Sequence, residues 1–156
     1  MNVIIVTPGH PGLRLKSYPP ALTAPYLAAL ATPYADRIKI YDLAVEPLKL
    51  SEPLPDIALL TTTMPQSDHI FEIARRLKAR AVTVLMGGPH VTLAYELDSR
   101  IKELADSVVL GEGEKALPRA LQDYREGRLQ PLYSMPVESL EGIPFSRLDL
   151  LYRSKY

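Results

Sequence analysis

The sequence predicts a doubly wound α/β fold: a parallel, five-stranded sheet with flanking helices and an extended C-terminal arm. Short apolar segments that end in polar, Gly or Pro residues alternate with segments long enough to form helices. Strands that alternate with helices are joined by right-handed crossovers, which produce a parallel sheet covered on both faces. At 156 residues with 47% apolar content, the chain is long enough for one sizeable core.

The expected strands have two kinds of pattern. Four are short apolar runs typical of buried parallel strands, whereas residues 37–42 alternate, as an edge strand with one wetter face does. The expected strands are residues 3–7, 37–42, 57–62, 82–86 and 108–110, and the expected helices are residues 23–34, 67–79, 93–104 and 115–126. This order is that of a Rossmann-like or flavodoxin-like sheet.

Two segments do not follow the regular alternation. Residues 43–55 contain three prolines, so the crossover after the second strand is expected to be irregular and not helical. After Gly127 the chain contains Pro131, Pro136 and Pro144 and has no sustained periodicity. We therefore expect an α/β domain over residues 1–127 and an arm or linker over residues 128–156.

The composition excludes several classes of function. Lysine plus arginine equals aspartate plus glutamate at 18 each, so no net charge favours nucleic acid or an anionic membrane as a partner. No apolar run approaches a membrane span and no leader pattern is visible, from which we expect a cytoplasmic protein. The absence of cysteine excludes disulfides, thiolate zinc sites, cysteine nucleophiles and an iron–sulfur cluster held by this chain.

Ligands of open parallel sheets bind beyond the carboxyl ends of the strands, so the loops there hold the candidate site residues. Two glycines directly after the fourth strand remove Cβ atoms where a ligand can approach the backbone, although a tight turn explains them equally well. A lone histidine such as His90 is more often a packing or capping residue than a ligand. The candidates are Pro8 and His10 after the first strand, Thr61, Thr62 and Thr63 after the third, Gly87, Gly88, Pro89 and His90 after the fourth, and Gly111, Glu112, Gly113 and Glu114 after the fifth.

These four loops differ in what they offer to a ligand. Because side chains alternate along a strand, at least one of the three threonine hydroxyls is expected to point into the crevice. Residues 111–114 open a helix, where the carboxylates either cap that helix or accept hydrogen bonds from a ligand. The chain lacks a P-loop, a dinucleotide G-x-G-x-x-G after the first strand, and a nucleophile elbow. No sequence motif therefore supports a hydrolase or dehydrogenase function.

Taken in order, the motifs resemble the N-terminal cobalamin (B12)-binding domain of B12-dependent radical SAM enzymes. The matching pieces are Tyr18-Pro19-Pro20, residues 25–30 (PYLAAL), Tyr41-Asp42, Thr61-Thr62-Thr63, Gly87-Gly88-Pro89-His90, Gly111-Glu112-Gly113-Glu114 and Gly142-Ile143-Pro144. The resemblance covers roughly residues 1–150. It implies a corrin ring over the carboxyl ends of the strands, with its nucleotide tail near residues 61–63 and 87–90, and residues 111–114 at corrin or tail polar groups.

The resemblance also implies a partner. In this family a radical SAM domain carries S-adenosylmethionine and a [4Fe–4S] cluster on three cysteines, which this chain lacks, so the chain is expected to be a cofactor holder and not a complete catalyst. The family's reactions are often methylations, and we expect the substrate to be bound by the absent domain. We expect either an N-terminal domain or a separate subunit, with cobalamin and a radical SAM domain or subunit as partners.

The loop after the first strand departs from the pattern of the wider B12 group. Other B12 proteins use D-x-H-x-x-G after the first strand to place a histidine on cobalt, whereas here the loop reads Pro8-Gly9-His10-Pro11-Gly12. We therefore expect binding without a protein histidine on cobalt, and His10 is the candidate should one ligate.

Two alternative functions stay open beside cobalamin binding. They are a flavodoxin-like domain for another nucleotide-bearing cofactor, and a cofactor-free docking domain. A valine at Gly88 is expected to block entry of the tail and leave the fold largely intact.

Overall fold

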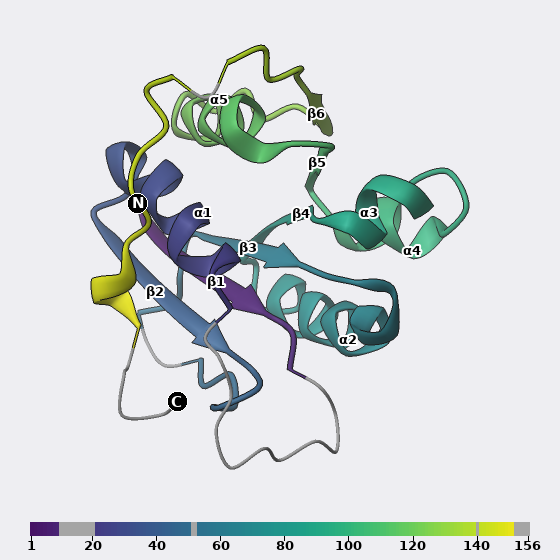
Figure 1. The fold of residues 1–156 in the computed structure, drawn as a ribbon. Coiled ribbons are helices and arrows are strands. Elements are labelled where there is room, and N and C mark those ends of the chain that lie inside the picture. The colour runs from purple at the N-terminus through teal and green to yellow at the C-terminus, as the bar shows by residue number, and fades with distance from the viewer. Residues whose placement is uncertain (10–20, 51–52, 140, 152–156) are drawn as a thin grey trace.

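The computed structural model contains a six-stranded sheet in which every neighbouring pair of strands is parallel, in the order β2-β1-β3-β4-β5-β6 (Figure 1). The structure describes residues 1–9, 21–50, 53–139 and 141–151. The strands are β1 (Asn2–Thr7), β2 (Arg37–Asp42), β3 (Ile57–Thr61), β4 (Thr83–Gly87), β5 (Ser107–Leu110) and β6 (Leu132–Ser134). The predicted doubly wound α/β class is confirmed, and β2 lies at an edge as its alternation indicated.

Helices cover both faces of the sheet. The helices are α1 (Thr23–Ala31), α2 (Ser67–Lys78), α3 (Pro89–Ala94), α4 (Ser99–Leu104) and α5 (Gly113–Arg125), with short 3-10 turns at Thr32–Tyr34, Met64–Gln66 and Leu148–Leu150. Helices α1 and α5 lie side by side on one face, and α2, α3 and α4 cover the other (Figure 1). No helix among these is long and apolar enough to cross a membrane.

Two hydrophobic cores result, because successive side chains of each buried strand point to opposite faces. On β1, Ile5 packs beneath α1 and α5, whereas Val6 packs beneath α2. The same alternation holds on β3, where Leu59 belongs to the first core and Leu60 to the second. This strict alternation decides which strand-end side chains can reach a given face.

Two expectations about the elements were wrong. The sheet has six strands and not five, because Leu132–Ser134, expected to lie in an extended arm, pairs in parallel with β5. The single helix expected over residues 93–104 is two short helices, since the chain turns between Ala94 and Ser99, where Asp98 caps α4 by accepting a hydrogen bond from the Arg100 backbone at 3.1 Å. Residues 43–50, as expected, contain no helix.

A buried carboxylate holds β6 to the sheet. Asp123, on α5, is 2% exposed and accepts hydrogen bonds from Arg119 Nε and Arg128 Nε at 2.9 Å and from the Tyr133 hydroxyl at 3.0 Å. The hydrogen bond from Arg128, together with those from Arg119 and the Tyr133 hydroxyl, holds the pKa of Asp123 below its usual range. Because Tyr133 is the central residue of β6, this network fixes the strand that sequence periodicity did not reveal.

The last described residues return to α1. The Arg147 backbone donates to Pro25 O at 2.9 Å and its guanidinium donates to Thr32 Oγ1 at 3.1 Å. Leu150 and Leu151 pack against the core beneath α1 and α5. The segment after β6 therefore lies along the outside of α1, over the same face of the sheet.

Candidate functional site

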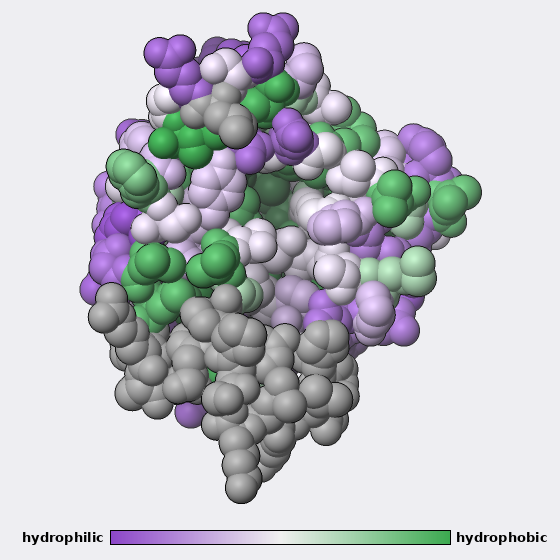
Figure 2. All heavy atoms as spheres, in the orientation of Figure 1, coloured by the Kyte–Doolittle hydropathy of each residue, from purple (hydrophilic) through white to green (hydrophobic). Residues whose placement is uncertain are grey.

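A cavity of about 190 Å³ opens at the carboxyl edge of the sheet, on the face covered by α1 and α5. Its volume is several times the roughly 30 Å³ that a water molecule occupies in the liquid. Figure 2 shows the surface hollowed near the centre of the face in view, with apolar atoms at the base of the hollow. The lining residues are Thr23, Tyr26, Leu27, Leu59, Leu60, Thr61, Leu85, Gly87, Gly88, Val109, Gly111, Gly113 and Leu117.

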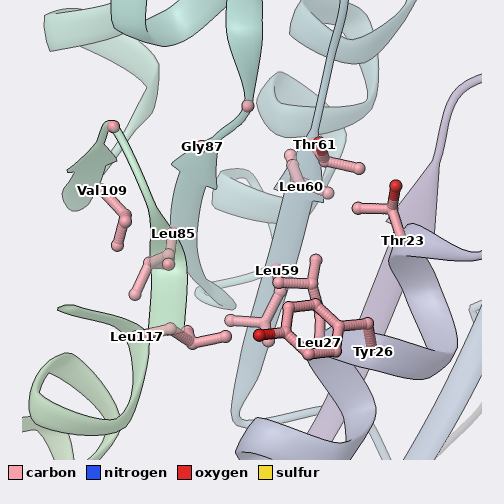
Figure 3. A pocket seen from close by; sticks show the side chains of 13 residues that line it. Thr23, Tyr26, Leu27, Leu59, Leu60, Thr61, Leu85, Gly87, Val109 and Leu117 are labelled. Atoms are coloured by element: carbon pink, nitrogen blue, oxygen red, sulfur yellow. The ribbon is translucent and has the colours of Figure 1, made fainter. Parts of the chain in front are cut away.

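The floor of the cavity is apolar. Leu59 and Leu85 are paired across β3 and β4 and point to the same face, with Val109 next to them on β5. In Figure 3 the side chains of Leu85, Val109 and Leu117 lie on one side of the pocket, beside Leu59 and across from the Tyr26 ring. A floor of branched aliphatic side chains favours a flat apolar group and not a phosphate, which requires donors.

The cavity also lies where such sheets bind ligands. The chain leaves β1 toward β2 on one side, and β3 occupies the other side of β1. At this reversal of strand order the flanking crossovers run on opposite faces and leave a crevice beyond the strand ends. The four loops that the sequence singled out all follow strands at this one edge, because the sheet is entirely parallel.

The three threonines separate as the alternation of a strand requires. Thr61 lines the cavity. Thr62 is 1% exposed, and its hydroxyl donates to Thr63 O at 2.9 Å. Thr63 is exposed, and its hydroxyl donates to Gln66 Oε1 at 2.6 Å. One hydroxyl therefore faces the crevice, and the other two stabilise the turn into α2.

The two glycines of β4 and its turn have different roles. A Cβ on Gly87 would lie 3.4 Å from Val109 O and 3.7 Å from Val109 Cβ, which are ordinary contacts, and would point over the cavity floor. Gly88 has φ of 99°, and a Cβ there would lie 2.6 Å from Thr61 Oγ1. The expectation that valine at Gly88 leaves the fold largely intact is therefore wrong, because that side chain would collide with β3 itself.

Pro89 and His90 do not line the cavity. Pro89 is exposed at the first position of α3, where proline's missing N–H is not needed. The His90 ring lies on the opposite face of the sheet, with its centroid 6.0 Å from that of Phe71 on α2. His90 therefore occupies a packing position, which is common for a lone histidine.

The loop after β5 contributes its glycines to the cavity and one carboxylate to its wall. Gly111 and Gly113 line the cavity, and a Cβ on either would have no atom within 4 Å. Glu112 is exposed and makes no capping hydrogen bond with its side chain. Glu114 Oε1 accepts a hydrogen bond from the Tyr26 hydroxyl at 2.9 Å, while its Oε2 is buried with no hydrogen-bond partner.

The link between Tyr26 and Glu114 joins α1 to α5 beside the cavity. Burial raises the pKa of Tyr26 to about 12, and the hydrogen bond to Glu114 and the negative charges of Glu114 and Glu112 contribute further. The tyrosine hydroxyl therefore keeps its proton, and its donor, throughout the neutral range. Figure 3 shows the Tyr26 ring forming one wall of the cavity.

Sequence reasoning about strand-end loops missed the contribution of α1. Thr23, Tyr26 and Leu27 line the cavity from the first turns of this helix. The signal was available, because a helix that follows a strand-end loop begins at the same edge as that loop, and small residues such as Ala24 and Ala28 allow it to pack closely on the sheet. Of the first-strand candidates, Pro8 is half-buried and absent from the cavity lining, and His10 lies outside the described residues.

No group of three or more His, Cys, Asp or Glu side chains that could hold a metal ion occurs among the residues that the structure describes. The cavity between α1 and α5 combines an apolar floor with glycine backbone along its lining. Its chemistry suits a planar apolar group that carries a few polar atoms near the rim, where Thr23 and Thr61 present hydroxyls (Figure 3).

Comparison with known proteins gives three findings. Residues 12–121 match the model of the B12 binding domain family. The chain is 33% identical over 162 aligned positions to an uncharacterized methyltransferase of Pyrococcus horikoshii, an alignment that covers 88% of this chain and 35% of that protein. A solved structure, the N-terminal domain of a hypothetical protein of Thermotoga maritima, is similar with a TM-score of 0.47 and 21% identity, over 79% of this chain and 98% of the other.

The chain spans about a third of the length of the curated relative that it matches. The family match covers more than half of the chain and contains α1, β3, β4, β5 and most of α5, the elements that line the cavity. The chain therefore belongs to the B12-binding domain family.

Proposed function

We propose that this chain is the cobalamin-binding domain or subunit of a B12-dependent radical SAM enzyme, and that its partner enzyme is a methyltransferase. The observation that carries the proposal is the apolar cavity at the carboxyl edge of the sheet. The term methyltransferase comes from the name of the Pyrococcus horikoshii relative. The radical SAM partner comes from the resemblance of the ordered motifs, since this chain holds no cysteine for a cluster.

The cavity residues fit the nucleotide tail of cobalamin. That tail ends in a flat, bicyclic aromatic base, which is largely apolar. Leu59, Leu85 and Val109 provide a flat aliphatic floor, and Gly87 leaves open the space above it that a side chain would fill. In this arrangement α1 and α5 would flank the base and the loops at the strand ends would hold the corrin. The bound cofactor would supply methyl-transfer chemistry at its cobalt.

Three further residues from the strand-end loops, Thr61, Gly111 and Gly113, line the same cavity. We propose that Thr61, Gly111 and Gly113 contact the tail where it enters, because they line the rim. Glu112, exposed at the start of α5, is free to meet polar groups of the corrin. We propose further that residues 1–127 form the binding domain and that residues 128–156 lead toward the radical SAM domain, with β6 as the part of that segment that joins the sheet.

Corrin retention tests the proposal. The folded apo chain is mixed with hydroxocobalamin and passed over a gel-filtration column, and the protein peak is examined by visible absorption. Corrin that elutes with the protein supports the proposal. Retention of a flavin and not of corrin would favour a domain for another nucleotide-bearing cofactor, and retention of neither by a folded chain would favour a cofactor-free docking domain.

The lower ligand of cobalt needs a separate experiment. We propose that no protein histidine ligates cobalt, because the first-strand loop lacks D-x-H-x-x-G. The Co(II) form bound to the protein is then expected to show no nitrogen splitting from histidine in its EPR spectrum. Splitting that disappears in His10→Ala would contradict this and identify His10 as the ligand.

A further inference from the structure

His90 lies in a side-chain cluster directly behind the glycine turn that forms one wall of the cavity. The turn runs from β4 through Gly87 and Gly88 into α3, and His90 is the second residue of that helix. Its ring faces the core beneath α2, on the side of the sheet opposite to the cavity, next to the fully buried Phe71. His90 is therefore attached to the cavity wall by two peptide bonds but cannot touch what the cavity holds.

Backbone hydrogen bonds tie this turn to the neighbouring strand. Thr62 N donates to Gly87 O at 3.3 Å, and His90 N donates to Thr62 O at 3.2 Å. The close approach of Gly88 to Thr61 and Thr62 leaves no room between the turn and β3. Any displacement of the His90 backbone is consequently transmitted to Gly87 and Gly88, and hence to the width of the cavity.

The side chain of His90 stands opposite a fixed carboxylate. Its Nε2 is buried with no hydrogen-bond partner and lies 3.8 Å from Asp98 Oδ2. Asp98 is held by Arg100, whose Nε and Nη2 donate to it at 2.8 and 2.7 Å. A shift of about 1 Å would bring Nε2 to the usual length of a charge-assisted hydrogen bond.

The carboxylate cannot readily move away from its position. Arg100 is itself held by Asp68, which accepts from Nη1 at 2.7 Å, and its guanidinium lies 4.6 Å from the centroid of the Phe71 ring. Residues of α2, α3 and α4 thus form one connected group around Phe71. Within this group His90 is the residue whose buried polar atom has no hydrogen-bond partner, so His90 gains a contact if the distance to Asp98 shortens.

We propose that His90 is the positioning residue of the Gly87–Gly88 wall, and that its contact with Asp98 shortens to a hydrogen bond when the cavity is filled. The second part of this inference rests on the proposed function. The role differs from direct contact with the cofactor, which the sequence alone suggested for His90. An unpaired buried polar atom costs free energy, so a ligand that presses on the wall and closes this contact is bound more tightly.

The first experiment needs no cofactor. Amide hydrogen exchange at Thr62 and His90, whose N–H groups tie the turn to β3, is followed by NMR in three proteins. These are the parent, His90→Phe, which keeps an aromatic ring beside Phe71 but has no polar atom, and His90→Gln, whose amide reproduces a donor near Nε2. The matched control is His69→Phe, since His69 is exposed on α2. Exchange at both amides is expected to be at least about tenfold faster in His90→Phe and close to the parent in His90→Gln and in the control. Unchanged exchange in His90→Phe would overturn the positioning role.

The second experiment measures the loaded protein. With 15N-labelled histidine, the chain has three side chains to assign, and the Nε2 resonance of His90 is expected to move toward a hydrogen-bonded value when hydroxocobalamin is added. The dissociation constant for hydroxocobalamin is expected to rise about tenfold in His90→Phe, the equivalent of one lost hydrogen bond to a charged group, and to stay within about twofold in His69→Phe. Equal affinity of parent and His90→Phe, or an unmoved resonance on binding, would overturn the inference. A parent that retains no corrin would instead reject the proposed function, and the exchange experiment would then decide the positioning role alone.

Discussion

Filling the cavity from Gly87 is the most direct test of where the ligand binds. Gly87 is the last residue of β4, and a Cβ there would make ordinary contacts 3.4 and 3.7 Å from atoms of Val109. The Cβ of Gly87→Val is therefore accommodated, and the three added carbons are expected to project over the cavity floor. They would take up a substantial part of the 190 Å³ cavity.

The expected loss of affinity follows from the burial that is prevented. An aromatic ring system buries about 150 to 250 Å². At about 25 cal/mol per Å², its exclusion costs about 4 to 6 kcal/mol. Since about 1.4 kcal/mol corresponds to a factor of ten, the dissociation constant for hydroxocobalamin is expected to rise about a thousandfold or more. Because valine is a good strand residue, thermal stability is expected to change little.

Two further variants make the test specific. Gly87→Ala adds one carbon and is expected to weaken binding much less than Gly87→Val, so that the loss follows the added volume. Thr83→Val changes the opposite end of β4, at a position away from the cavity, and is expected to leave affinity unchanged. Binding would be measured by equilibrium titration of visible absorption. Unaltered affinity in a folded Gly87→Val would refute the placement of the tail in this cavity.

The remaining predictions concern stability. Gly88→Val is expected to destabilise the fold by more than about 2 kcal/mol, because it combines a disfavoured positive φ with a collision against Thr61, and chemical denaturation would measure it; an unchanged midpoint would show that the turn can rearrange. The pKa of Asp123 is lowered by its hydrogen bond from Arg128 first of all, so its contribution is present above the unfolded value near 3.9 and is lost as the pH falls below it. The protection of the Leu132–Ser134 amides, relative to their intrinsic exchange rates, is therefore expected to fall toward acid pH in the parent and to be low at all pH values in Asp123→Ala. The pKa of Tyr26 is raised to about 12, so its contribution is present below the unfolded value of 10.0 and is lost as the pH rises through the folded value; the decline in stability in that alkaline range is expected to be smaller in Tyr26→Phe.

The sequence by itself determined the fold class and the edge of the sheet at which the cavity lies. Buried parallel strands are continuous apolar runs, and the run at residues 57–61 is recognisable without any knowledge of its neighbours. Once the strands are parallel, all their carboxyl ends lie at one edge. Gly87 and Gly111, which follow two of those runs, were therefore identified from local pattern and line the cavity.

Only the tertiary structure decided which face each strand-end residue occupies. Period two shows that Thr61 and Thr62 point to opposite faces but not which of them shares a face with α1 and α5. His90 was assigned to the ligand from its place in the chain, whereas α3 directs its ring toward Phe71 on the other face. The contribution of Tyr26 depends likewise on α1 packing beside α5, a contact between residues that are 88 positions apart.

The sixth strand, β6, was likewise decided only by the tertiary structure. Leu132–Ser134 is too short to show a period, and its parallel pairing with β5 depends on the buried carboxylate of Asp123 and on the Tyr133 hydroxyl. Such pairings are long-range and specific to the assembled side chains, so local pattern does not encode them. Local sequence thus specified the sheet and the edge at which its loops gather, and the packing of helices on the two faces selected the residues that form the cavity.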